Sequence, residues 1–245
     1  MPNTSKRQNI RKGLIIGSFL LFPLIIFYFS PYIIVMGAIK GIVVSSFVMF
    51  TLLFIFSIFF GRAACGYSCP MGGLQECLML SNNRKVKGGK FNLIKYCIWL
   101  LWIVSIAILF VRAGGIKEFD FFFEAAYYPH SINTYMIYYG VILGVVILAL
   151  TAGRRAFCHY ACWIAPFMVT GTKIAKILRI PALHLKADKQ KCIACDKCSK
   201  KCPMSLEVMD MVKNDCMTDS ECILCGECVD VCPKKAIFYS FKRKK

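Results

Sequence analysis

Two copies of one cysteine run, Cys192-x-x-Cys195-x-x-Cys198-x-x-x-Cys202-Pro203 and Cys222-x-x-Cys225-x-x-Cys228-x-x-x-Cys232-Pro233, lie near the end of the chain. Each cysteine of the first run has a counterpart 30 positions later. Three cysteines at x-x steps, with a fourth before proline, are typical of iron–sulfur ligation. Zinc sites usually pair two cysteines, leave a gap and pair again. The stretch therefore predicts iron–sulfur clusters, with zinc sites or a disulfide framework as the alternatives.

This spacing is that of the bacterial two-cluster ferredoxins, in which the fourth cysteine of each run binds the cluster of the other run. It predicts a C-terminal α+β ferredoxin-like domain over residues 186–241 that carries two [4Fe-4S] clusters. The crossed ligand sets are Cys192, Cys195, Cys198 and Cys232 for one cluster, and Cys222, Cys225, Cys228 and Cys202 for the other.

The composition of the 245-residue chain indicates a membrane protein with a soluble tail. Hydrophobic residues make up 58% of the chain and gather in its first two thirds. The formal net charge of +18 comes from lysines and arginines at the ends of apolar runs and in the C-terminal third, which fits membrane topology better than nucleic-acid binding. Fifteen cysteines, at least eight of them candidate iron ligands, indicate a reducing cytoplasm or an anaerobic cell.

Four apolar runs, at about 13–29, 42–60, 93–111 and 135–150, have lengths near that needed to cross a bilayer. They predict a mainly α-helical integral membrane protein with four transmembrane helices over residues 13–165. Basic residues in the segment 1–12 and between the second and third runs place both termini on the cytoplasmic side of the cell membrane. Residues 166–185 are expected to form a basic amphipathic helix and a connector, and 242–245 a basic tail.

A second pair of motifs follows the second and fourth apolar runs. Gly61-Arg62-Ala-Ala-Cys65-Gly-Tyr-Ser-Cys69 aligns with Arg154-Arg155-Ala-Phe-Cys158-His-Tyr-Ala-Cys162 at an offset of 93. The alignment predicts a duplicated two-helix unit whose copies face each other across a pseudo-two-fold axis. The sulfurs of Cys65, Cys69, Cys158 and Cys162 would then meet and could hold a third iron–sulfur cluster. The alternatives are thiols that contact a quinone or flavin, a redox-active disulfide pair, or structural cysteines.

Polar residues of these motifs allow two interpretations each. Arg62, Arg154 and Arg155 either tune a cluster or bind a quinone oxygen, or they are topology anchors at a membrane edge. His159 either donates a hydrogen bond to a cluster sulfur or quinone carbonyl, or is a structural histidine. The remaining cysteines, Cys77, Cys97 and Cys216, lie outside all four motifs.

The combination of four apolar runs, two Cys-x-x-x-Cys motifs and a double-cluster tail resembles the NapH type of membrane quinol dehydrogenase subunit and the polyferredoxin half of NosR proteins. The resemblance covers residues 13 to 240, with the departure that Trp163 stands where the first motif has Pro70. It implies an electron-transfer subunit of an oxidoreductase that passes electrons between cytoplasmic-side clusters and a quinone pool or a partner redox subunit. A cytoplasmic electron donor or acceptor protein is the expected partner. An accessory protein that reduces a metal, flavin or thiol centre of a client, or a redox sensor, is the alternative.

Overall fold

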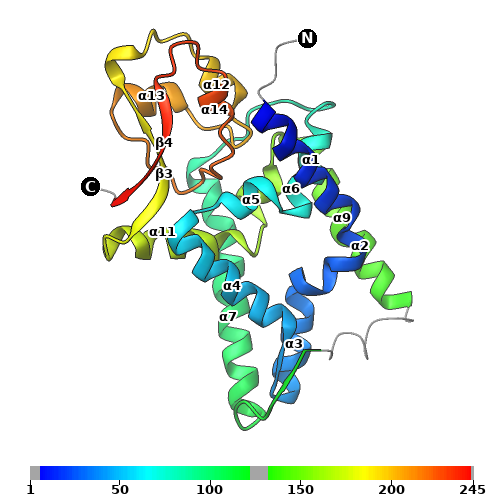
Figure 1. Cartoon of the computed structure of the whole chain (residues 1–245). Helices are drawn as coiled ribbons and strands as arrows, with labels where there is room; N and C mark the ends of the chain where they lie inside the picture. The colour runs from blue at the N-terminus through cyan, green and yellow to red at the C-terminus, as the bar shows by residue number, and fades with distance from the viewer. Residues whose placement is uncertain (1–5, 122–131, 244–245) are drawn as a thin grey trace.

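The computed structural model describes residues 6–121 and 132–243, and Figure 1 shows a body of helices with a small unit around two strands at one end. The elements of the helical body are α1 (Lys6–Leu20), α2 (Phe22–Ile25), η1 (Ile26–Phe29), α3 (Pro31–Lys40), β1 (Ile42–Val44), α4 (Ser45–Phe60), α5 (Ala63–Tyr67), α6 (Pro70–Leu78), η2 (Gly89–Leu93), α7 (Ile94–Arg112), β2 (Glu118–Asp120), α9 (Ile132–Ala152), α10 (Ala156–Tyr160) and α11 (Ala165–Ile177). The C-terminal unit contains β3 (Pro181–Ala187), η3 (Lys189–Lys191), α12 (Lys197–Lys201), α13 (Val208–Lys213), α14 (Glu227–Asp230) and β4 (Ile237–Arg243).

The expectation of four transmembrane helices over residues 13–165 is wrong. Over the described residues, one helical stretch, Gly89–Arg112, is long and apolar enough to cross a membrane, with 24 residues and a mean hydropathy of 2.3. The other apolar helices, Pro31–Lys40, Ser45–Phe60 and Met136–Ala152, are 10 to 17 residues long. The chain is instead a mixed helical fold that carries a two-stranded C-terminal unit.

The first expected span, 13–29, is not one continuous helix. Helix α1 starts seven residues earlier, at Lys6, and ends at Leu20, where a turn leads into the short α2. Pro23 lies in this second helix, and a proline within a continuous helix would remove a backbone hydrogen bond. The basic start of α1 does not mark a loop, because Arg11 is 1% exposed and packs inside the protein.

The second expected span, 42–60, begins as a strand. Residues Ile42–Val44 form β1 and pair in parallel with Glu118–Asp120 of β2, so that α4 starts only at Ser45. Helix α4 packs closely against α11, where a side chain at Gly171 would collide with Ser57. The apolar face of α11 is therefore covered by protein, and Met168 is fully buried.

The C-terminal unit is larger than the sequence pattern predicts. Strand β3 occupies part of the expected connector and pairs antiparallel with β4, from Pro181 opposite Arg243 to Ala187 opposite Ile237. The expected connector before residue 186 and part of the expected tail after 241 are thus strand. Their pairing joins residues 50 to 62 positions apart, which no local pattern in either segment reveals.

Candidate iron–sulfur sites

The second ferredoxin run lines a buried cavity together with one cysteine of the first run. Cys222, Cys225 and Cys228 meet Cys202 there, among apolar side chains such as Ile223. Burial raises the pKa of Cys225 to about 12 and the pKa values of Cys202 and Cys222 to about 11. These thiols are protonated at neutral pH, so iron binding here must displace protons.

The first run lines a separate cavity with the complementary set. Cys192, Cys195 and Cys198 surround it with Cys232 from the second run. Each cavity therefore receives one of the crossed sets, and four thiolates are the donor set that a [4Fe-4S] cluster requires. In residues 6–121 and 132–243, no three Cys, His, Asp or Glu side chains lie close enough to hold one metal ion. The ligand roles of these eight cysteines remain predictions.

The two Cys-x-x-x-Cys motifs come together at the centre of the helical body. Cys65 lies on α5 and Cys158 on α10, while Cys69 and Cys162 each lie two residues after the end of these short helices. The Cys69 thiol interacts electrostatically with the other three. Burial raises its pKa and brings the pKa of Cys162 to about 12. The structure thus groups the four cysteines that an offset of 93 relates, which we call the thiol tetrad.

A buried ion-pair network lies beside the tetrad, next to the first Cys-x-x-x-Cys motif. Arg62 Nη1 lies 2.8 Å from Glu221 Oε2, and Lys95 Nζ lies 2.6 Å from both oxygens of the same carboxylate. Burial disfavours the charge of Arg62, but Cys65 and Glu221 outweigh this effect and raise its pKa above the usual value. Arg62 therefore remains a cation beside the thiols, and the carboxylate ties it to the C-terminal unit.

The matched residue of the second copy has an equivalent environment from other elements. Arg155 donates to Glu76 Oε1 and, over 2.9 Å, to the carbonyl oxygen of Cys65. The same carboxylate accepts two bonds from Arg11, at 2.8 and 3.0 Å. Burial opposes the charge of Glu76, yet Arg155 and Arg11 outweigh it and lower the pKa of this carboxyl. Each copy thus places one buried arginine, held by one carboxylate, next to the tetrad.

The two arginines make the tetrad suitable for an anionic group. Arg62 Nε and Arg155 Nε are both buried without a hydrogen-bond partner within the described part of the protein. Both side chains are 1% exposed or less, and both interact electrostatically with Cys158. Four thiols framed by two cations with unused donors fit an iron–sulfur cluster, whose sulfurs accept hydrogen bonds.

Gln75 is a functional candidate that the sequence patterns do not reveal. Its side chain is fully buried on α6, and its Nε2 donates to Cys158 Sγ over 3.3 Å. Its Oε1 accepts from the backbone N–H of Phe157 over 3.0 Å, which fixes the amide orientation. Glu76 was missed for the same reason: both residues follow the first motif by a few positions and lie in no recognisable metal-binding spacing.

The second ferredoxin cavity adjoins the tetrad directly. Arg154 Nη1 donates to the carbonyl oxygen of Cys202 over 3.3 Å. The Cα of Gly66 approaches the cavity loop so closely that a Cβ there would lie 2.5 Å from the carbonyl oxygen of Ile223. The ring nitrogens of His159 lie 3.0 Å from Asn92 Oδ1 and 3.1 Å from the carbonyl oxygen of Met204. His159 is therefore committed to structural contacts at this junction, and burial lowers its pKa to about 4.

An apolar cavity lies on the other side of the tetrad. Its volume is about 110 Å³, and apolar side chains form nearly all of its lining. Cys69 and Cys162 both line it, and its walls are largely aromatic and aliphatic, including Phe22, Tyr138 and Trp163. A ring-shaped apolar molecule in this cavity would lie against two of the four thiols.

Comparisons with protein families support the cysteine chemistry. The 4Fe-4S binding domain family matches residues 42–87 and again residues 134–181, and the 4Fe-4S dicluster domain family matches residues 191–237. The double match of one domain agrees with the duplication at an offset of 93. The dicluster match covers all eight cysteines of the two ferredoxin runs.

Three curated proteins are similar to the chain at low identity. The uncharacterized proteins MJ0749 and MJ0750 of Methanocaldococcus jannaschii are 24% and 25% identical over 74% and 79% of this chain. The protein named "Putative electron transport protein YccM" of Escherichia coli (strain K12) is 22% identical over 82% of this chain. The matches span 65%, 78% and 57% of these proteins, so the chain covers less than two thirds of the first and third. No solved structure matches the chain significantly.

These observations define the class of the protein. The family matches, the grouped cysteines and the similarity to the protein named "Putative electron transport protein YccM" support an iron–sulfur protein of electron transfer. The prediction of iron–sulfur binding is confirmed at this level. The number of clusters and the identity of the electron donors and acceptors belong to the proposal below.

Proposed function

We propose that the chain passes electrons between two ferredoxin-type [4Fe-4S] clusters and a membrane quinone or a partner redox subunit, with a third cluster at the thiol tetrad between them. The crossed sets would hold the first two clusters, and Cys65, Cys69, Cys158 and Cys162 the third. Each cluster supplies one-electron redox chemistry when bound. The protein supplies fixed positions, buried cations and an apolar acceptor cavity.

One observation carries this proposal: the order in which the sites pack. Cys65 and Cys158 belong to the same buried core group as Cys202, Cys225 and Cys228 of the second ferredoxin cavity. Cys162 belongs to a different core group, and Cys69 packs against that group. This second group also contains residues that line the apolar cavity. The tetrad therefore bridges the ferredoxin unit and the cavity, as an intermediate carrier must.

Exposed apolar side chains support a location at a membrane. Leu101 and Val111 on α7 are 71% and 79% exposed, and Leu143 on α9 is 58% exposed. Such a surface is unfavourable in water and fits contact with lipid or with a membrane subunit. We place the ferredoxin unit on the cytoplasmic side, where reduced thiolates persist, and the apolar cavity near the lipid, from which a quinone could enter.

Iron and sulfide analysis of anaerobically prepared protein, combined with EPR, tests this proposal. Three paramagnetic centres are expected in the wild type, and a Cys65→Ser, Cys158→Ser double variant should lose one of them while keeping the two ferredoxin centres. Quinol oxidation or quinone reduction by the wild type, lost in the same variant, would link the tetrad to turnover. Fully loaded wild type with two centres only would remove the tetrad from the pathway.

A further inference from the structure

The two ferredoxin runs differ in their exposure to solvent, although their sequences are copies. Ile193 is 57% exposed, whereas its counterpart Ile223 is 1% exposed. Cys195 is exposed, whereas its counterpart Cys225 is buried. The first run therefore lies at the surface, and the rest of the chain covers the second run.

The cover of the second run is the basic helix α1. Arg7 Nη2 lies 2.8 Å from Asp230 Oδ1, and Arg11 Nη2 lies 3.3 Å from Glu227 Oε1. Gln8 Nε2 adds a hydrogen bond of 3.0 Å to the carbonyl oxygen of Cys225. Arginines of α1 thus cover the second run, which carries acidic side chains at these contacts.

The first run has the opposite charge at the matched position. Lys197 stands where the second run has Glu227, and Lys191 and Lys234 line the same cavity. All three lysines are exposed, and the described lining contains one acidic residue, Asp196. Lys191 also lies 2.9 Å from Asp188. Since that ion pair is exposed to solvent, it holds the lysine only weakly.

We propose that the lysine rim, formed by Lys191, Lys197 and Lys234 around the exposed Ile193 and Cys195, docks a small acidic protein that carries one electron at a time. This inference rests on the proposed function and specifies the partner of its outer site. An acidic surface around the partner's redox centre would complement the rim, as α1 complements the second run with reversed charges. Ile193 would provide the apolar centre of the contact.

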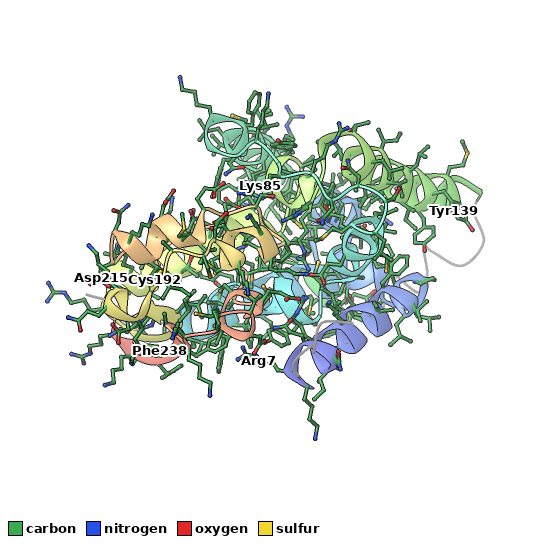
Figure 2. All side chains as sticks on the ribbon, turned by 90° about the horizontal axis from the view of Figure 1, so that it is seen from above. Arg7, Lys85, Tyr139, Cys192, Asp215 and Phe238 are labelled. Carbon is green, nitrogen blue, oxygen red and sulfur yellow. The ribbon has the colours of Figure 1, made fainter. Side chains whose placement is uncertain are left out.

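The position of the rim agrees with an entry point for electrons. In Figure 2, Cys192 lies toward one end of the molecule and Tyr139 of α9 at the other, so the rim is remote from this end of α9, whose Tyr138 lines the apolar cavity. The transfer moves one electron from the reduced partner to the first cluster and makes or breaks no covalent bond. The partner is oxidised by one electron, and the cluster is reduced by one.

Stopped-flow reduction by an acidic plant-type [2Fe-2S] ferredoxin, itself reduced beforehand, tests the proposal on cluster-loaded protein. A Lys191→Glu, Lys197→Glu, Lys234→Glu variant should react at least about 10-fold more slowly at low ionic strength and approach the wild-type rate in high salt. The matched control reverses three other exposed lysines, Lys173, Lys176 and Lys186, and should react like the wild type.

Equal rates for the rim variant and the control would overturn the proposal. Iron content, EPR spectra and reduction by dithionite, measured on all three proteins, separate this failure from a failure of the proposed function. If the rim variant alone loses binding to anionic vesicles while its reduction by the ferredoxin is unchanged, the rim contacts lipid, and the proposal is also overturned.

Discussion

Glu76→Gln removes the charge that holds two buried arginines together. The Glu76 carboxylate accepts bonds from Arg11 at 2.8 and 3.0 Å and one from Arg155, and both arginine side chains are 1% exposed or less. Glutamine keeps the size of the side chain but offers one acceptor oxygen and no charge. The two cations would face each other across a neutral amide that also donates hydrogens toward them.

The expected loss is large because the site is buried. Removing one partner of a buried ion pair typically costs about 3–5 kcal/mol, since the other charge is left uncompensated. For a chain of this size, that corresponds to a fall of about 6–20 °C in the midpoint of thermal unfolding. Because Arg155 also donates to the Cys65 carbonyl, we expect the cluster proposed at the tetrad to be lost in the same temperature range.

The assay is a thermal melt of cluster-loaded protein, followed by circular dichroism of the helices and by visible absorption of the clusters. The matched control is Glu207→Gln, whose carboxylate lies 2.7 Å from Lys85 Nζ in an exposed pair. An exposed pair contributes about 0–1 kcal/mol, so the control should melt within a few degrees of the wild type. Indistinguishable melts for the two variants would refute the reasoning.

The difference in stability between the wild type and Glu76→Gln should depend on pH with a definite sign. Arg155 and Arg11 lower the pKa of Glu76 against the opposing effect of burial. A carboxyl with a lowered pKa in the folded state stabilises the fold above its unfolded pKa, and this contribution disappears as the pH falls through the folded pKa. The gap between wild type and Glu76→Gln should therefore be largest near neutral pH and shrink in acid. A gap that widened in acid would contradict this assignment.

Three further substitutions test separate contacts. Gln75→Leu removes the hydrogen bond to Cys158 Sγ, and should lower the reduction potential of the tetrad centre in EPR-monitored titration while both ferredoxin centres keep theirs. Gly66→Ala places a methyl group 2.5 Å from the Ile223 carbonyl oxygen, and should lower the stability by about 1–3 kcal/mol or more, seen as earlier melting. Cys216→Ser should leave iron content and EPR unchanged, because this exposed thiol contacts none of the three cysteine sets; loss of a centre would contradict the ligand assignments.

The grouping of the cysteines could be predicted from the sequence because it depends on internal repetition. The offset of 30 relates Cys202 to Cys232, and the crossed arrangement places each in the cavity of the other run. The offset of 93 relates Cys65 to Cys158, and the two lie together in the fold. Repeated motifs that share one backbone geometry constrain each other, so local spacing carries information about distant contacts.

The number of spans could not be predicted, because hydropathy does not record the long-range partners of polar residues. The sequence pattern makes Arg11 one of the basic residues that mark topology before an apolar run, yet it bonds to Glu76, 65 residues away. Hydropathy makes Ile42–Val44 the start of a span, although this segment pairs with β2. In both places, the helix starts at a different residue from the apolar run, at Lys6 and at Ser45, so the length of the run does not equal the length of the helix.

The two buried arginines indicate how the duplicated unit became asymmetric. Arg62 and Arg155 occupy matched positions, but Arg62 is held by Glu221 of the C-terminal unit and Arg155 by Glu76 of α6. Because Glu221 directly precedes Cys222 in the chain, Arg62 links the tetrad to the second ferredoxin cavity. Arg155 links the tetrad to α1 and α6 instead. A symmetric pair of motifs thus has a ferredoxin side and an opposite side, and this distinction suits the proposed carrier between two different redox partners.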